Sequence, residues 1–235
     1  VIGQSSLTGS GANAGGLSAS SLSGPDGPPA NDGTSLFVSD GQNHRVLVYN
    51  PIPTANTPAA SFALGQPNLT TATANTGGTS PATMNSPAGL AISGTRLAVA
   101  DRGNNRVLLW NTIPTAGSTP ADVVLGQPSF VVSGASPTAN NSATNEPMGL
   151  FTYNGQLYVA DRLLHRVAGW TRIPTQLNAP IDAVLGQGDV NSGAPNAGGL
   201  TASRLQAPSN ILATEVGIYI ADTGNGRVVG FPPLP

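Results

Sequence analysis

Short apolar segments separated by polar, turn-forming residues run the length of the chain. In the stretch 89–125 the apolar runs cover residues 89–92, 96–100, 107–110 and 123–125. These runs are rich in Val, Leu and Ile and end at Gly, Asn, Asp or Pro, which is typical of β-strands. The first two connections are short enough for hairpins. The stretch therefore predicts four consecutive antiparallel strands.

The same pattern recurs four times, and three motifs mark it. A loose Val-Leu-Gly-Gln motif places its glycine at Gly3, Gly65, Gly126 and Gly186, at spacings of 62, 61 and 60 residues. A second motif ends an apolar run with Asp and places Arg five residues later: Asp40 and Arg45, Asp101 and Arg106, Asp161 and Arg166, Asp222 and Arg227. A third, Ile-Pro-Thr, begins at Ile52, Ile113 and Ile173. We expect one domain over residues 1–235, with repeat units of approximately 5–66, 67–127, 128–187 and 188–235 plus 1–4.

A single four-stranded meander cannot bury both of its faces, so neighbouring units must stack. A radial array of such sheets solves this problem, and the predicted fold is an all-β, four-bladed β-propeller with four antiparallel strands per blade. The last unit stops after its third strand, whereas residues 1–4 carry the fourth-strand motif. We therefore expect the N-terminal strand to close the last blade and remove an exposed edge. The alternative is an open piece of a longer array that pairs between chains. In the first unit, Pro28 and Pro29 fall where the other units have their first run, which weakens the prediction of an inner strand there.

The composition narrows the function classes. The chain has 30 Gly and 21 Pro, and the repeat explains them as turn residues that separate its strands. Charged residues make up only 9% of the chain. All nine basic residues are Arg, and they form no cluster, which argues against a nucleic-acid footprint. No apolar run approaches the ~18 residues of a membrane span. The absence of Cys excludes disulfides, thiolate metal sites and a cysteine nucleophile.

The four Asp–Arg pairs use four of the nine Arg and four of the eleven acidic residues. Five-residue spacing across a hairpin lets the carboxylate meet the guanidinium or cap turn amides. We interpret them as structural ion pairs, with an anionic ligand on the Arg fork as the alternative.

The same turns hold the candidate ligand-binding residues of the loop face, which are His44, Asn104, His165 and Asn225. The two histidines lie in units one and three, so they either face each other across the axis or pack against their own turns. A catalytic zinc site usually needs three protein ligands. The sequence predicts no metal site, no cofactor and no catalytic residue.

Aromatic residues recur at the end of the third strand of each unit: Tyr49, Trp110, Trp170 and Phe231. Repetition at one position favours packing between blades. Sugar stacking, with one aromatic ring per blade, is the alternative.

The segment from Leu97 to Leu108, with the sequence LAVADRGNNRVL, resembles the core of an NHL repeat, and Asn43-His44-Arg45-Val46 matches its eponymous part closely. The third unit departs, with Leu164 where Asn43 and Asn104 stand. The chain looks like the bacterial extracytoplasmic NHL-type proteins with Val-Leu-Gly-Gln repeats. The resemblance implies a propeller that binds something, since NHL domains serve in protein recognition, in RNA binding and, in an amidating lyase, in catalysis.

These observations predict a non-enzymatic binding or assembly module that holds a protein partner, or a larger extracellular assembly, through its loop face or flanks. We expect an extracellular, periplasmic or cell-surface location, with any signal peptide already removed, and no nucleic-acid binding or membrane insertion. The alternatives are a carbohydrate-binding propeller with one weak site per blade, and a lyase or hydrolase with its site at the channel mouth.

Overall fold

The computed structural model describes residues 1–135 and 138–234, and it divides them into four antiparallel sheets that we call blades 1 to 4. Blade 1 contains β1 (Ala30–Asn31), β2 (Leu36–Asp40), β3 (Arg45–Tyr49) and β4 (Phe62–Leu64). Blade 2 contains β5 (Pro87–Ser93), β6 (Arg96–Asp101), β7 (Arg106–Trp110) and β8 (Val123–Leu125). Blade 3 contains β9 (Pro147–Tyr153), β10 (Gln156–Asp161), β11 (Arg166–Trp170) and β12 (Ala183–Leu185). Blade 4 contains β13 (Ile211–Ala213), β14 (Ile218–Asp222) and β15 (Arg227–Phe231).

The all-β, four-bladed β-propeller fold predicted from the repeat is confirmed. The strands of blade 2 coincide with the predicted runs to within two residues at each end. As the two prolines suggested, the inner strand of blade 1 is short: β1 spans two residues. Proline lacks the N–H that a strand ladder needs, so Pro28 and Pro29 delay its start. The helical elements of the described part are three 3₁₀ turns, Gly41–Asn43, Arg102–Asn104 and Thr223–Asn225, and no helix there is long and apolar enough to cross a bilayer.

The core lies between the blades, as separate layers that repeat the same positions. At the junction of blades 1 and 2, Phe37 and Val46 of the first sheet pack against Leu97, Val99 and Trp110 of the second. The equivalent positions of blades 2 and 3, and then of blades 3 and 4, form two further apolar clusters. Blades 2 and 3 therefore bury one face against the blade before them and the other against the blade after them.

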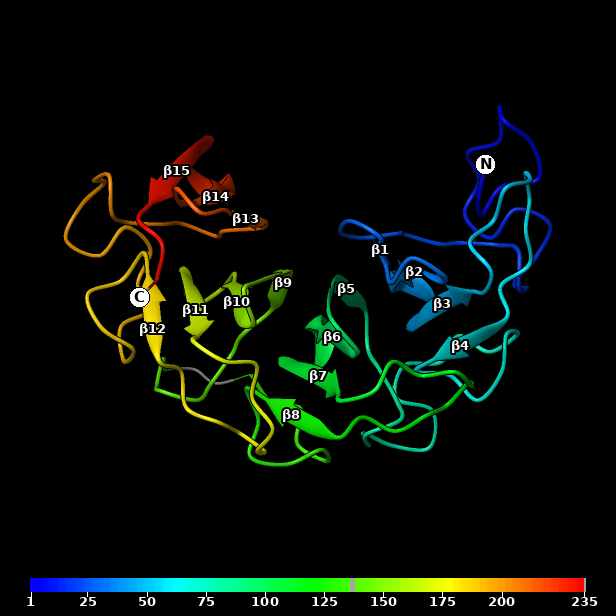
Figure 1. Cartoon of the computed structure of the whole chain (residues 1–235), viewed down its shortest axis with the longest axis horizontal. Coiled ribbons are helices and arrows are strands. Elements are labelled where there is room, and N and C mark those ends of the chain that lie inside the picture. The colour runs from blue at the N-terminus through cyan, green and yellow to red at the C-terminus, as the bar shows by residue number, and fades with distance from the viewer. Residues whose placement is uncertain (136–137, 235) are drawn as a thin grey trace.

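The blades form an open arc, which Figure 1 shows with blades 1 and 4 on opposite limbs. This corrects one detail of the predicted fold, since the N-terminal strand does not close the last blade and blade 4 has three strands in the described structure. Residues 1–4 instead lie beside blade 1, where the carbonyl of Val1 accepts a hydrogen bond from Thr57 N–H at 2.8 Å and Ile2 packs against the Leu47 and Tyr49 cluster. The curvature set by the three packed junctions leaves this segment out of reach of β15.

The inner strands approach one another so closely that glycine is required. A Cβ atom at Gly89 of β5 would lie 2.3 Å from the carbonyl oxygen of Met148 and 2.7 Å from the backbone nitrogen of Leu150 in β9. A Cβ atom at Gly149 would lie 2.4 Å from the Ser209 carbonyl oxygen ahead of β13. These contacts are with backbone atoms, which cannot move without shifting a strand.

We predict that Gly89→Ala lowers the free energy of unfolding by about 3 kcal/mol, at the upper end of the cost of overpacking. Gly11→Ala is the matched control, since a Cβ atom there would meet nothing within 4 Å, and a change within about 0.5 kcal/mol is expected. Urea unfolding of both variants measures the difference. Equal losses would show that the close approach of β5 and β9 is not the cause.

Candidate functional site

The predicted Asp–Arg pairs are present in all four blades, at the turn between the second and third strands. Asp ends the second strand and Arg begins the third, so the two residues are register partners across the hairpin. The distance between Arg Nε and Asp Oδ2 is 2.7 Å in blades 1, 2 and 4 and 3.0 Å in blade 3. Both side chains are fully buried in the first three blades, whereas Arg227 of blade 4 is 29% exposed.

Each arginine also binds the long polar segments, or linkers, that join one blade to the next. In blade 2, Arg106 Nη2 donates to the carbonyl oxygens of Ser80 and Thr83, both at 2.9 Å, in the linker that enters the blade. Its Nη1 donates to the carbonyl oxygen of Phe130 in the linker that leaves the blade. Asp101 Oδ1 accepts from the backbone N–H of Asn85 at 2.7 Å. One ion pair therefore holds a hairpin and two linkers, and we call this arrangement the clamp.

The clamp leaves no guanidinium free for an anionic ligand in the first three blades. The same donors and acceptors recur for Arg45 and for Arg166, which bind linker carbonyls on both sides. Burial raises the pKa of Asp101 and raises that of Asp161 to about 6, against the opposing pull of Arg106 and Arg166. Asp161 also lacks the amide that Asn104 donates to Asp101, because Leu164 stands at that position.

Asn104 and Asn225, two of the predicted ligand-binding residues, are engaged in the clamp. Asn104 is 1% exposed, exchanges two 2.8 Å hydrogen bonds with Asn75 of the linker, and donates to Asp101 at 2.7 Å. Asn225 makes the equivalent bonds to Asn196 and Asp222. The amide groups of Asn104 and Asn225 are therefore hydrogen-bonded to other residues of the same chain.

His44 and His165 lie at junctions between blades and do not face each other across an axis. His44 Nδ1 accepts a 3.0 Å hydrogen bond from the backbone N–H of Ser86, where the chain enters blade 2, and His165 Nδ1 accepts one from Ala207, where it enters blade 4. Asn105 occupies the same position in the second blade, and its Oδ1 accepts from the N–H of Glu146. All three acceptor residues have left-handed backbone conformations with φ between 52° and 54°. The side chain at this position therefore couples one blade to the next.

Sequence reasoning missed the role of the glutamine in Val-Leu-Gly-Gln. Gln127 Nε2 donates to the carbonyl of Asn105 at 3.1 Å and to that of Gly134 at 2.8 Å, so it joins the clamp turn to the outgoing linker. Gln66 and Gln187 make equivalent pairs of bonds. The signal was the presence of Gln in all four copies, in a segment whose other residues are apolar or glycine.

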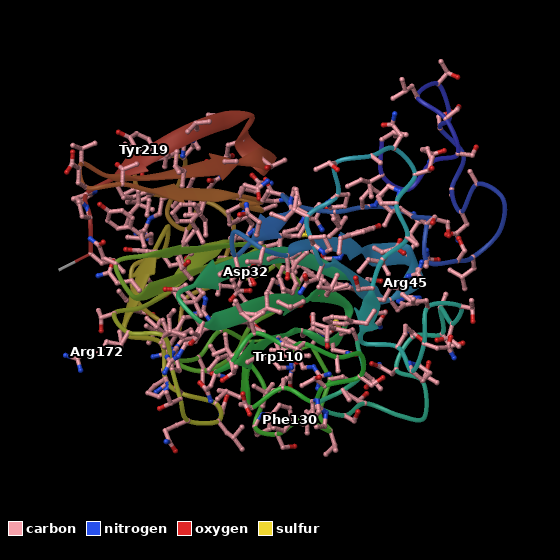
Figure 2. All side chains as sticks on the ribbon, turned by 45° about the vertical axis from the view of Figure 1, so that its right-hand side comes forward. Asp32, Arg45, Trp110, Phe130, Arg172 and Tyr219 are labelled. Atoms are coloured by element: carbon pink, nitrogen blue, oxygen red, sulfur yellow. The ribbon has the colours of Figure 1, made fainter. Side chains whose placement is uncertain are left out.

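The recurring aromatic residues pack inside the molecule in the first three blades. Trp110 and Trp170 are 1% exposed, and their indole N–H groups donate to the carbonyls of Thr119 and Ala179. Tyr49 is also 1% exposed. Figure 2 shows Trp110 among the strands of the interior. Sugar stacking on these rings would require them to be accessible, so the sugar-stacking alternative loses three of its four rings.

The hollows that are lined by residues outside the clamps include the following two. One of about 520 Å³ is bounded by the β5–β6 and β9–β10 turns, Arg96 and Arg172. Arg96 Nη1 already donates to the Ile173 carbonyl at 3.0 Å, and Arg172 points into solvent (Figure 2). The other, of about 360 Å³, lies along the inner strands β1, β5 and β9 and is mainly apolar. Among the described residues, no three His, Asp or Glu side chains gather in a group that could hold a metal ion.

The last blade exposes three apolar side chains on one face of its sheet. Leu212 pairs with Tyr219 across the strands, and Val228 pairs with Ala221 and so lies diagonal to Tyr219. The three are 51%, 41% and 71% exposed. Figure 2 shows Tyr219 on this outermost sheet. At the Val228 position the other blades have Val46, Val107 and Val167, all 0% exposed. We call the face formed by Leu212, Tyr219 and Val228 the open flank.

We predict that Arg106→Leu lowers the free energy of unfolding by about 4 kcal/mol, because it leaves the Asp101 carboxylate buried without its cation. Arg227→Leu is the matched change in a partly exposed clamp that holds one linker only, and roughly half that loss or less is expected. Denaturant unfolding measures both. Equal losses would mean that burial and linker binding do not determine how much a clamp contributes to the free energy of unfolding.

We also predict that the two histidines decrease the free energy of unfolding as the pH falls. Burial lowers the pKa of His44 and of His165, and Arg162 lowers that of His165 further. Between the lowered pKa and the usual value near 6.5 the unfolded chain binds more protons, so stability decreases as the pH falls through this window. Protonation also removes the Nδ1 lone pair that accepts the junction hydrogen bond.

The control for this pH effect is the double variant His44→Asn and His165→Asn, which copies Asn105. The raised pKa of Asp161 has the opposite effect, since stability falls as the pH rises from 3.8 to about 6, and it is common to both proteins. The difference in unfolding free energy between pH 7.5 and pH 5 should therefore be more positive in the parent than in the double variant. An identical pH dependence would contradict the assignment.

Comparison with known proteins bears on the fold. No protein-family model matches the sequence, and a search of curated proteins found no match. Among solved structures, the chain is similar to a putative phosphatase from Bacteroides thetaiotaomicron, with a TM-score of 0.51, 14% identity and coverage of 86% of this chain and 47% of that one. It is also similar to the computationally designed protein Ika8, with a TM-score of 0.50, 9% identity and coverage of 91% and 48%.

A third similar structure is the glutaminyl cyclase of Myxococcus xanthus, with a TM-score of 0.49, 12% identity and coverage of 89% of this chain and 66% of that one. The chain thus spans between about half and just under two thirds of the length of these three structures. At such identities the likeness concerns architecture alone. The architecture of this chain is that of a β-propeller.

Proposed function

We propose that the protein is a non-enzymatic, extracytoplasmic assembly module that holds a protein partner through the open flank of blade 4. The observation that carries this proposal is the exposure of Leu212, Tyr219 and Val228 on a face that the first three blades bury. A contiguous apolar patch is typical of a protein–protein contact. The Tyr in its centre suits such a contact, because tyrosine is enriched in interface cores.

The flank is a better candidate than the loop face. The loop face is built from clamp turns and linkers, and its Asp, Asn and Arg side chains are engaged within the chain. A partner there would have to compete with these internal hydrogen bonds. At the flank, an apolar partner surface would remove water from side chains that have no internal contact on that side.

An extracytoplasmic location belongs to the same proposal, and it is supported by the absence of Lys and Cys.

The test places a photo-crosslinking amino acid at Tyr219 and, as a control, at Leu177, which is 50% exposed away from the flank. In cells that express the chain, irradiation should yield a covalent adduct with a polypeptide from position 219 and not from position 177. Val228→Arg, which puts a charge on the flank, should suppress the adduct. Absence of an adduct at 219, or a Val228→Arg variant that retains it, would overturn the proposal.

A further inference from the structure

We infer that the hollow of about 520 Å³ between blades 2 and 3 binds a small molecule that carries a carboxylate or a phosphate group, held by Arg96 and Arg172. The hollow lies where β6 begins, at the opposite end of that strand from the clamp residue Asp101. None of its lining residues belongs to a clamp or to the open flank. This site is therefore separate from the surface of the proposed function, and its volume is typical of small-molecule sites.

The two arginines lack the counter-charge that most arginines of this protein have. Six of the nine bind a carboxylate, four in the clamps and two in partly exposed pairs. Within the part of the chain that the structure describes, Arg96, Arg172 and Arg204 form no ion pair. Two of these three line the same hollow, and its lining contains no Asp or Glu. Asp182 lies outside the lining, and its Oδ2 accepts hydrogen bonds from the N–H and the hydroxyl of Thr171.

Both arginines also depart from the repeat. The position of Arg96, five residues before the clamp aspartate, is occupied in the other units by Ser35, Gln156 and Gly217. The position of Arg172, six residues after the clamp arginine, is occupied by Pro51, Thr112 and Pro233. The clamp residues recur in every unit because the scaffold needs them, whereas these two cations come together at one junction only. Departures from a regular pattern are expected at functional sites.

Arg96 is held in place with part of its guanidinium available. Its Nη1 donates to the carbonyl oxygen of Ile173 at 3.0 Å, which ties the start of β6 to the segment that follows β11. Its Nε and Nη2 have no hydrogen-bond partner among the described residues. Because the guanidinium is a rigid planar fork, this one bond fixes its plane at the wall of the hollow. The other donors are then left for a ligand.

Arg172 supplies a second cation that can move. Its exposed side chain points into solvent (Figure 2) and has no hydrogen bond or ion pair with a described residue. The backbone next to it is fixed, because the N–H of Ile173 donates to the Gly155 carbonyl at 2.9 Å and Pro174 is buried. Exposed side chains change rotamer within nanoseconds. The guanidinium of Arg172 can therefore fold over a ligand that Arg96 holds.

The other walls suit a small polar organic molecule. Ser93 and Thr175 contribute hydroxyl groups, which both donate and accept hydrogen bonds, and Ile173 and Pro174 contribute apolar surface. Carboxylates and phosphates each accept two parallel N–H bonds from one guanidinium. Their shared chemistry is an oxyanion that Arg96 can bind through two donors, with the hydroxyls around the rest of the molecule.

The test compares three sugars that differ only at the sixth carbon, which are glucose 6-phosphate, glucuronate and glucose. The Nε–H signals of the arginines in the full, ¹⁵N-labelled chain report on binding in NMR spectra at low salt. The signals of Arg96 and Arg172 should shift with an acidic sugar and stay in place with glucose, while those of the clamp arginines should not move. A response to glucose 6-phosphate alone identifies a phosphate ligand, one to glucuronate alone a carboxylate ligand, and one to both an oxyanion of either kind.

The variants Arg96→Gln and Arg172→Thr copy the residues that blades 3 and 2 have at these positions, so the fold should be retained. Each should weaken binding about tenfold or more, as expected for the loss of charge-assisted hydrogen bonds. The matched control is Arg204→Gln, which removes the same charge outside the hollow and should leave the affinity unchanged. The inference is overturned if neither acidic sugar shifts the two signals, if glucose shifts them equally, or if Arg204→Gln weakens binding as much.

Discussion

The buried clamp arginine is the interaction on which the rest of the structure depends. A guanidinium taken out of water is costly unless a carboxylate and further acceptors satisfy its donors. Arg106 meets this condition only when the hairpin, the entering linker and the leaving linker are all in place. The long Gly-, Ser- and Asn-rich segments, which have few apolar side chains of their own, are therefore ordered because their carbonyls solvate a buried charge. The same requirement explains why a chain with so few charges repeats one ion pair in every unit.

This use of polar groups constrains function. The turn residues of this propeller are engaged in clamps, in junction hydrogen bonds and in linker hydrogen bonds. Few polar side chains are therefore left to bind a ligand on the loop face. The side chains that stay exposed in the described structure include the apolar residues Leu212, Tyr219 and Val228 of the open flank. An apolar face of this kind suits the protein contact proposed above.

The sequence was enough to predict the period, the strands and the clamp pairs, because each depends on local signals such as an apolar run, a turn and a fixed spacing across one hairpin. The partners of His44 and Gln66 could not be found in this way, because the first reaches a residue 42 positions ahead in the next blade and the second a backbone carbonyl that has no sequence signature. The curvature of the arc could not be predicted from the sequence either. The angle between blades depends on how the side chains of each apolar cluster, such as Phe37 and Trp110 at the first junction, fill the space between the sheets. A repeat length alone does not encode this angle. The assumption that four units make a closed ring failed for this reason.

Repeat arrays are held together by nearest-neighbour interfaces, so their two ends always present faces that evolved to be covered. Many arrays solve this problem with atypical terminal units whose outer face is polar. Blade 4 follows the repeat pattern instead, with Leu212, Tyr219 and Val228 on its outer face, and blade 1 keeps Leu36 and Val38 on the opposite one. The face that blades 1, 2 and 3 bury at their junctions is the face that blade 4 exposes in the described structure. The proposed protein contact therefore uses the same apolar positions that hold neighbouring blades together.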